Sequence, residues 1–182
     1  TGILPMKIHI SKEISLQSIT PKDCEQLYCL MVAIYPTAYQ YFWKDAGTWY
    51  VKSQYSESQI KKELLVTNAE YYFVLFKGEI IGNFRIVWDE KLAGISEEKQ
   101  VKLHRIYLHQ NAQGKGIGKA LLFWLEEKAI AKGYTMIWLD AMDEKPQTFA
   151  FYKRLGYQYH SHEYLPFELM YDSYRKMSQL YK

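Results

Sequence analysis

A glycine-rich hexapeptide, QGKGIG at residues 113–118, stands between a hydrophobic segment and a helical pattern. Glycines leave the backbone N–H groups uncovered, and the start of the following helix adds free donors and the positive end of its dipole. Such loops bind anions, phosphate groups above all. No Asp or Glu occurs from Lys99 to Leu125, whereas five Lys and Arg residues do. The pattern predicts a phosphate-bearing ligand at this loop.

The segments around the loop predict a crossover between two parallel strands. Residues 101–108 read as a strand that enters the loop, and a helix with apolar residues at steps of four then runs from Ile117 to Gly133. A mostly apolar strand at 134–140 is expected to be buried on both faces, which is typical of parallel pairing. A further helix spans 146–155.

The rest of the chain predicts strands and helices without repeats. A strand at 14–19 and two helices, one opening at the cap Thr20-Pro21 and one at 56–65, precede a hairpin turning at Gly78. Residues 89–100 read as a loop, and two more strands follow residue 157, the last carrying Tyr174 and Met177. The aromatic segment from Tyr35 to Tyr50 either lines a pocket or covers the core.

Composition limits the class of protein. With 182 residues, of which 48% are hydrophobic, we expect one domain over residues 6–182, with residues 1–5 a leader or a cloning remnant. The net charge of +3 is mixed along the chain, so we expect neither nucleic acid nor a membrane as partner. No signal peptide or membrane-spanning run is recognised, which favours a cytoplasmic location. His160 and His162 lack a third ligand, so no metal is predicted.

Two motifs together carry a family resemblance. The hexapeptide matches the Q/R-x-x-G-x-G/A signature of the GCN5-related N-acetyltransferase (GNAT) family, and FYKRLGY at 151–157 resembles that family's F-Y-x-x-x-G-F/Y segment. The resemblance covers nearly the whole chain and implies a single-domain α/β (α+β) fold. Its mixed central sheet would have about six to seven strands, flanked by about four helices, with a splay between two parallel strands. Within the family, the chain looks most like the bacterial PaiA-type polyamine N-acetyltransferases.

The resemblance implies acetyl-CoA as cosubstrate, lying in the splay between strands 101–108 and 134–140. Backbone groups of Ile106 and Leu108 would bind the pantetheine amides, and N–H groups of the loop would hold the pyrophosphate. Lys145 stands where the family commonly has Asn, which puts contacts from that segment in question. The implied cofactor-binding residues are Ile106, Tyr107, Leu108, Gln113, Gly114, Lys115, Gly116, Ile117, Gly118, Lys119 and Lys145.

The implied reaction is direct attack of a primary amine on the thioester. An alkyl ammonium has a pKa of about 10, so a base must remove its proton. His104 best matches the position where many relatives carry a Glu, and an imidazole suits this role at neutral pH. Tyr152 matches the family tyrosine that protonates the departing thiolate. The structural alternatives are a strand histidine without catalytic duty and a core aromatic residue.

Other functions fit the sequence less well. A dinucleotide-binding oxidoreductase would need Gly where Lys119 stands, and a Walker A loop would need Gly and Ser or Thr where Gln113 and Ala120 stand. A catalytically silent acyl-CoA-binding or regulatory module of the same fold stays an alternative, because His104 replaces Glu and Lys145 replaces Asn.

The acceptor is expected to be a small-molecule amine, with a polyamine among the candidates. A polyamine would need several acidic partners near the thioester. The resemblance also implies homodimerisation through the C-terminal strands, a habit of the family. The candidate acids are Asp45, Glu90, Asp140, Asp143 and Glu144.

Overall fold

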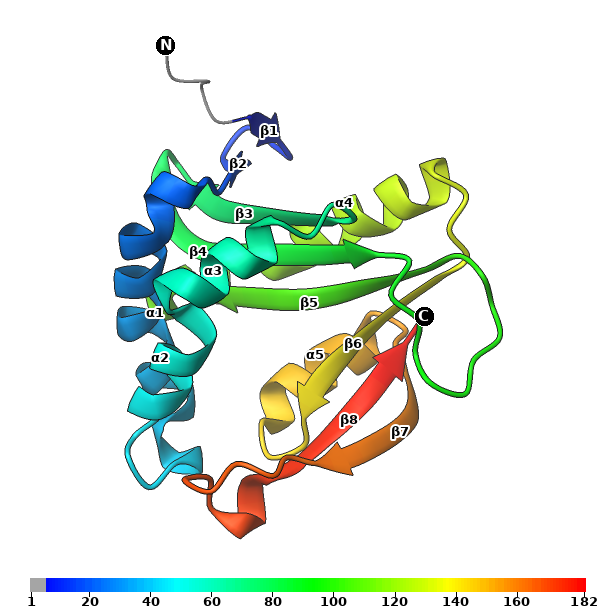
Figure 1. Ribbon diagram of the computed structural model, residues 1–182. Coiled ribbons are helices and arrows are strands. Elements are labelled where there is room, and N and C mark those ends of the chain that lie inside the picture. Colours follow the sequence, from blue (N-terminus) through cyan, green and yellow to red (C-terminus); the bar gives the residue numbers. More distant parts are fainter. Residues whose placement is uncertain (1–5) are drawn as a thin grey trace.

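The computed structural model describes residues 6–182, so the expectation about residues 1–5 lies outside the described residues. These residues form one eight-stranded mixed sheet of order β1-β2-β3-β4-β5-β6-β8-β7 (Figure 1). All neighbouring strands are antiparallel except β5 and β6. The predicted α/β class and mixed sheet are confirmed. The strands are β1 Lys7–His9, β2 Ile14–Ser18, β3 Ala69–Phe76, β4 Glu79–Trp88, β5 Gln100–Leu108, β6 Met136–Met142, β7 Gln158–Tyr164 and β8 Lys176–Tyr181.

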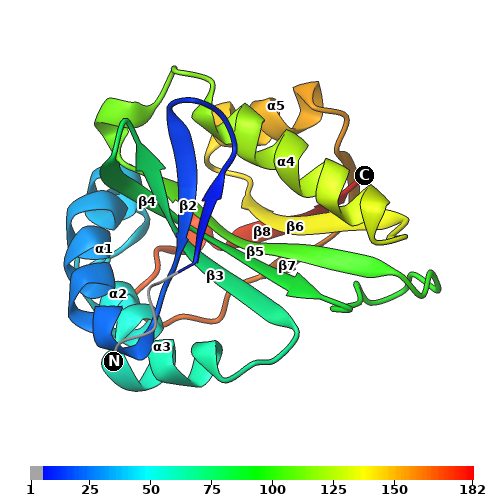
Figure 2. The same cartoon turned by 90° about the horizontal axis from the view of Figure 1, so that it is seen from above.

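Helices cover both faces of the sheet (Figure 2). One layer consists of α1 (Cys24–Tyr39), α2 (Thr48–Tyr55) and α3 (Glu57–Leu64). The opposite layer consists of α4 (Ile117–Ala131) and α5 (Pro146–Arg154). Each layer packs on its own hydrophobic cluster, with Tyr72 and Val74 of β3 on the α4 side and Phe73 and Leu75 on the α1 side. This alternation explains why β3 is apolar at nearly every position.

Three expectations about the elements were incomplete. The described chain has one strand more than expected, the short edge strand β1, and one α-helix more, α2. Helix α2 was missed because its cap is remote: the Asp45 carboxylate accepts hydrogen bonds from the N–H groups of Gly47 and Trp49. Tyr174 lies in a 3₁₀ turn (Asp172–Tyr174) before β8 rather than in the last strand. No helix within residues 6–182 has the length and apolar character needed to cross a bilayer.

The parallel pair β5 and β6 separates halfway along its length. Its last paired residues are Leu103 and Leu139, whereas β5 stays paired with β4 as far as Leu108. On β4, Arg85 pairs with Arg105 and the next residue, Ile86, pairs with Leu103, so His104 is an extra residue in β5. This is a β-bulge, which bends a strand and increases its local twist. The predicted splay therefore opens directly after Leu103 and Leu139.

A substitution at Gly82 tests how closely β4 approaches the end of β5 that is not paired with β6. A Cβ added there would lie 2.1 Å from the carbonyl oxygen of Tyr107 and 2.9 Å from Cδ2 of Leu108. Because the first neighbour is backbone, Gly82→Ala must displace β5, and we expect a loss of about 1–3 kcal/mol in the free energy of unfolding, measured by urea denaturation. Gly78→Ala in the same hairpin is the control for backbone strain alone, since Gly78 has φ +84° and open space around it. An unchanged unfolding midpoint for Gly82→Ala would contradict this close approach.

Candidate active site

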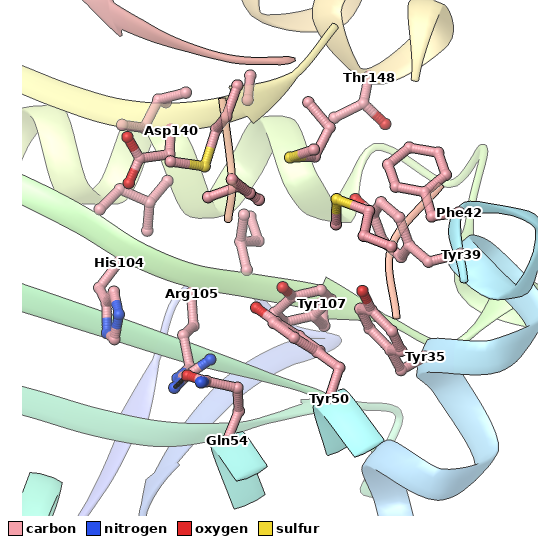
Figure 3. Close-up of a pocket in the computed structure, with 18 of the residues that line it drawn as sticks. Tyr35, Tyr39, Phe42, Tyr50, Gln54, His104, Arg105, Tyr107, Asp140 and Thr148 are labelled. Atoms are coloured by element: carbon pink, nitrogen blue, oxygen red, sulfur yellow. Dashed lines mark hydrogen bonds between the residues drawn. The ribbon is translucent and has the colours of Figure 1, made fainter. Parts of the chain in front are cut away.

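Two cavities open where β5 and β6 separate. The first, here called the central pocket, has a volume of ≈ 170 Å³ and lies on the side of the α1–α3 layer (Figure 3). The second, here called the glycine-loop groove, has a volume of ≈ 390 Å³ and runs along the loop and the start of α4. The two cavities have Ile106, Thr148 and Tyr152 as common walls. The two cavities therefore adjoin at these residues.

The glycine loop presents a run of free backbone N–H groups. Gly114 and Gly116 adopt φ of +77° and +75°, in the left-handed region, and Gly116 caps the N-terminus of α4. Within the described residues, the backbone N–H groups from Gly114 to Lys119 donate to no protein acceptor. A Cβ on Gly114 or Gly116 would meet no atom within 4 Å, so glycine is required there for conformation rather than for space. This run of free donors at a helix N-terminus suits a phosphate group.

Eight of the predicted cofactor residues line the groove, and three do not. The side chains of Lys115 and Lys145 lie elsewhere, with their Nζ atoms 5.3 Å from the ring of Phe76 and 5.0 Å from the ring of Tyr39. Tyr107 lines the central pocket instead. The eight that line the groove are Ile106, Leu108, Gln113, Gly114, Gly116, Ile117, Gly118 and Lys119.

Sequence analysis missed Gln147 and Arg154, which also line the groove. They lie on α5 at helical spacing from Phe151, another wall of the groove, so one face of that helix follows the loop. That spacing was a usable signal. Arg154 adds a second cation to the groove beside Lys119, which fits an anionic ligand.

Tyr152 stands at the junction of the two cavities. It comes from α5, is 5% exposed and forms part of the α4-side core. Burial raises the pKa of its hydroxyl well above the usual value of a phenol. Tyr152 is therefore a neutral side chain at physiological pH, able to donate a proton or a hydrogen bond.

His104, the bulged residue of β5, is held by Arg85. Its Nδ1 lies 2.7 Å from Nη1 of Arg85. Because a guanidinium only donates, Nδ1 must accept, and the neutral ring carries its proton on Nε2. Burial, together with the charges of Arg105, Arg85 and Lys102, lowers the pKa of His104 to about 2. This environment keeps the ring neutral and weighs against the predicted role as base.

A buried cluster of charged side chains lies between the bulge and helices α2 and α3. Glu63 of α3 accepts hydrogen bonds from Nη2 of Arg105, at 3.1 Å to Oε1 and 3.3 Å to Oε2. Arg105 also donates to the hydroxyl of Tyr55 at 3.3 Å and to Oε1 of Gln54 at 3.1 Å, both on α2. Nε of Arg85 lies 3.7 Å from Oε1 of Glu63. The cluster therefore ties α2 and α3 to the two central strands.

Asp140 is the one carboxylate among the residues that line the central pocket in the described chain. Its Oδ1 accepts a hydrogen bond from Nε2 of Gln179 at 2.9 Å, and its Oδ2 lies 3.0 Å from Nζ of Lys102. In Figure 3 it approaches the pocket from β6, across from His104 on β5. It is thus an anchored anion at the mouth of the splay.

The other four candidate acids do not line the pocket. Asp45 caps α2, and Asp143 accepts a hydrogen bond from Ser178. Glu90 and Glu144 are exposed. Of the five candidate acids, Asp140 alone lines the central pocket, because each of the other four lies beyond a strand end or before a helix start, outside the splay.

The fold has counterparts among known proteins. A solved structure of the PaiA N-acetyltransferase from Thermoplasma acidophilum in complex with coenzyme A has 18% identity and a TM-score of 0.68, covering 91% of this chain and 97% of that one. A structure of RimL, a ribosomal L7/L12 alpha-N-protein acetyltransferase, in complex with coenzyme A has 16% identity and a TM-score of 0.74, covering 97% of each chain. These likenesses show the fold.

Sequence comparison gives the family. An uncharacterised N-acetyltransferase encoded in the pepI 3′ region of Lactobacillus delbrueckii subsp. lactis is 23% identical over 107 residues, which is 59% of this chain and 62% of that protein. The match thus spans less than two thirds of the relative's length. The profile of the acetyltransferase (GNAT) family matches residues 29–157, the span that holds the splay, the glycine loop and Tyr152. The chain belongs to the acetyltransferase (GNAT) family.

Proposed function

We propose that this protein transfers the acetyl group of acetyl-CoA to a primary amine. The observation that supports this most is the meeting of two chemically different cavities at Tyr152. The groove offers free N–H groups and cations to an anionic cofactor, while the central pocket offers aromatic walls and one carboxylate to an acceptor. A thioester at the end of a chain lying in the groove would stand beside the hydroxyl of Tyr152.

The groove fits the parts of coenzyme A in order. The N–H groups from Gly114 to Lys119 would hold the pyrophosphate, with Lys119 and Arg154 adding charge. Ile106 and Leu108 lie beyond the last β5–β6 pair, so backbone groups on that edge are free to bind the pantetheine amides. No part of this fit needs a metal ion.

The reaction consists of one bond formed and one broken. The amine nitrogen attacks the thioester carbonyl, the C–N bond forms, and the C–S bond breaks with its electron pair leaving on sulfur. Tyr152 supplies a proton to that sulfur and recovers one from the solvent. The nitrogen loses two protons in total when it starts as an ammonium, so the overall reaction releases one proton.

The group that accepts the nitrogen's protons does not follow from the position of His104, because the ring of His104 is held neutral. For His104 to take a proton on Nδ1, the 2.7 Å hydrogen bond from Arg85 would have to break. The role of base at His104 therefore stays a prediction, and the variants described below separate it from Asp140.

Fewer observations support a polyamine as the acceptor than support acetyl transfer to an amine. PaiA is one fold neighbour, and RimL, named for a protein N-terminus, is another with a higher TM-score. The carboxylates that a polyamine would need do not gather in the central pocket. A silent acyl-CoA-binding module would bind the cofactor without turnover, so binding and turnover must be measured separately.

Calorimetric titration with acetyl-CoA tests the cofactor. We expect binding in the micromolar range, no binding of NADH as control ligand, and at least a tenfold loss of affinity in Gly116→Asp, which adds a negative charge and a strained φ to the glycine loop. Release of free coenzyme A thiol on addition of amines then reports turnover. Absence of acetyl-CoA binding would overturn the proposed function, and binding without thiol release for any amine would indicate the silent module.

Tyr152→Phe tests the proton donor. Loss of a general acid typically costs 10²–10⁴-fold in rate, so we expect kcat to fall by about 10²-fold or more while acetyl-CoA affinity stays within about twofold. Tyr157→Phe is the matched control, because Tyr157 is equally buried in the same segment but lines neither cavity. A wild-type kcat in Tyr152→Phe would exclude Tyr152 as the acid without affecting the cofactor assignment.

The variant His104→Gln tests whether the imidazole of His104 stays neutral in the folded protein, through the pH dependence of the free energy of unfolding. In the unfolded chain a histidine takes up a proton near pH 6.5, whereas in the folded protein the pKa of His104 is lowered to about 2. The unfolded state therefore binds the extra proton between these values, and folding stability falls as pH drops below about 6.5. Between pH 7.5 and 5.0 this contributes a loss of up to about 2 kcal/mol, which His104→Gln should remove. Urea denaturation at both pH values measures it, with His9→Gln on exposed β1 as control; an identical loss in His104→Gln and wild type would contradict the assignment.

A further inference from the structure

We propose that the acceptor is a compact monoamine with an apolar or aromatic body, and that the Asp140 carboxylate receives its amino group. This rests on the proposed function and names the substrate class for the same site. Three features of the central pocket carry it: the position of Asp140, the balance of charge around it, and the composition of the opposite wall.

Asp140 occupies the point where a reacting amine must come. Leu139 is the last β6 residue paired with β5, so Asp140 is the first residue of β6 beyond the separation, as His104 is on β5. Both line the central pocket together with Tyr152. Figure 3 shows Asp140 and His104 on opposite sides of the opening. An amine nitrogen that enters this opening meets a carboxylate on β6 and a neutral imidazole on β5.

The carboxylate is held in place but keeps capacity for a further partner. Gln179 donates to Oδ1 and Lys102 lies beside Oδ2, so each oxygen has one protein partner. Gln179 is itself positioned by Ser161, whose hydroxyl donates to Oε1 of Gln179 at 3.0 Å. A carboxylate has about four lone-pair sites, so an ammonium can bind Asp140 without displacing these contacts.

The charge balance disfavours more than one ammonium. Glu63, the one acid that is buried in the described residues, already interacts with both Arg85 and Arg105. Lys102 is a further cation at Asp140 itself. A polyamine would place its second ammonium in a pocket whose described lining includes Arg105 and no second carboxylate. Burying an unpaired charge there is costly, which disfavours a polycation.

The opposite wall is aromatic and rigid. Tyr35 stacks on Tyr39 and Tyr50 with ring centroids 4.9 Å and 4.7 Å apart, and Tyr107 meets Tyr35 edge-on at 6.2 Å. Burial raises the pKa of Tyr35, Tyr39 and Tyr107, so these hydroxyls stay neutral. The volume of ≈ 170 Å³ is close to the roughly 150 Å³ of an apolar cavity that binds benzene. A body about the size of one aromatic ring fits these walls.

Asp140 then serves both binding and proton transfer. It binds the incoming R–NH₃⁺ and passes one of its protons to water, because the ammonium has no lone pair and only the free R–NH₂ can attack. After the nitrogen bonds to the thioester carbon, its second excess proton passes to the Asp140 carboxylate. The carboxylate is regenerated when that proton reaches the solvent, so no further reactant is consumed.

The test compares acceptors and variants in the same thiol-release assay. The acceptors are 2-phenylethylamine, spermidine and a peptide with an N-terminal serine. We expect kcat/KM for 2-phenylethylamine to exceed that for spermidine and the peptide by at least about tenfold. A preference for spermidine or for the peptide would overturn the proposed acceptor class, whereas failure of all three amines together with absent acetyl-CoA binding would instead overturn the proposed function.

Variants then test Asp140 itself. We expect Asp140→Asn to raise KM for 2-phenylethylamine about tenfold and to lower kcat as well, with acetyl-CoA affinity and the thermal midpoint close to wild type. Glu144→Gln, which removes an exposed carboxylate outside the pocket, should stay within twofold of wild type. Asp140→Glu should restore part of the loss and keeps the test meaningful if Asp140→Asn folds poorly. Wild-type kinetics in Asp140→Asn, with activity lost in His104→Gln, would overturn the proposal and return the base to His104.

Discussion

The separation of β5 from β6 is the constraint on which the rest of the structure depends. Two parallel strands that stayed paired to their ends would satisfy their backbone groups and leave no opening in the sheet. Here the pairing ends at Leu103 and Leu139, and the bulge at His104 increases the twist of β5 at that point. The unpaired strand edges and the cavity both result from this separation of the two strands.

The buried cluster of Glu63, Arg85 and Arg105 stabilises the bulge at which the strands separate. Buried ion pairs contribute little net stability compared with hydrophobic packing, because desolvation of the charges offsets their attraction. Their value here is positional: in the bulged register Arg105 contacts both oxygens of Glu63, and Arg85 donates to Nδ1 of His104. Because a shift of one residue turns every side chain of a strand to the other face, a β5 without the bulge could not keep all these contacts. The cluster therefore favours the bulged register.

The sequence predicted those parts of the site that are local in the chain. The glycine loop, the following helix and Tyr152 lie within about fifty residues and have residue patterns of their own, so their structure could be predicted. The Glu63–Arg105 pair could not, because its members are 42 residues apart and neither pattern requires the other. Helix α2 was missed for a related reason, since its cap at Asp45 acts across several residues. The position of the candidate acids could not be predicted either. The charge of a carboxylate does not indicate on which side of a strand end it lies.

The two cavities differ in the same way: local contacts build the groove, and distant contacts build the central pocket. The residues that line the groove all lie within one continuous stretch, 106–154. The central pocket draws Tyr35 and Tyr50 from the α1–α2 layer, Asp140 from β6, and Leu165 and Met170 from the segment before β8. Its shape depends on how α1, α2 and that segment pack against the opened sheet. The proposed cofactor could therefore be inferred from a motif within one stretch, whereas the proposed acceptor has to be argued from the charges and rings that several distant segments bring together around Asp140.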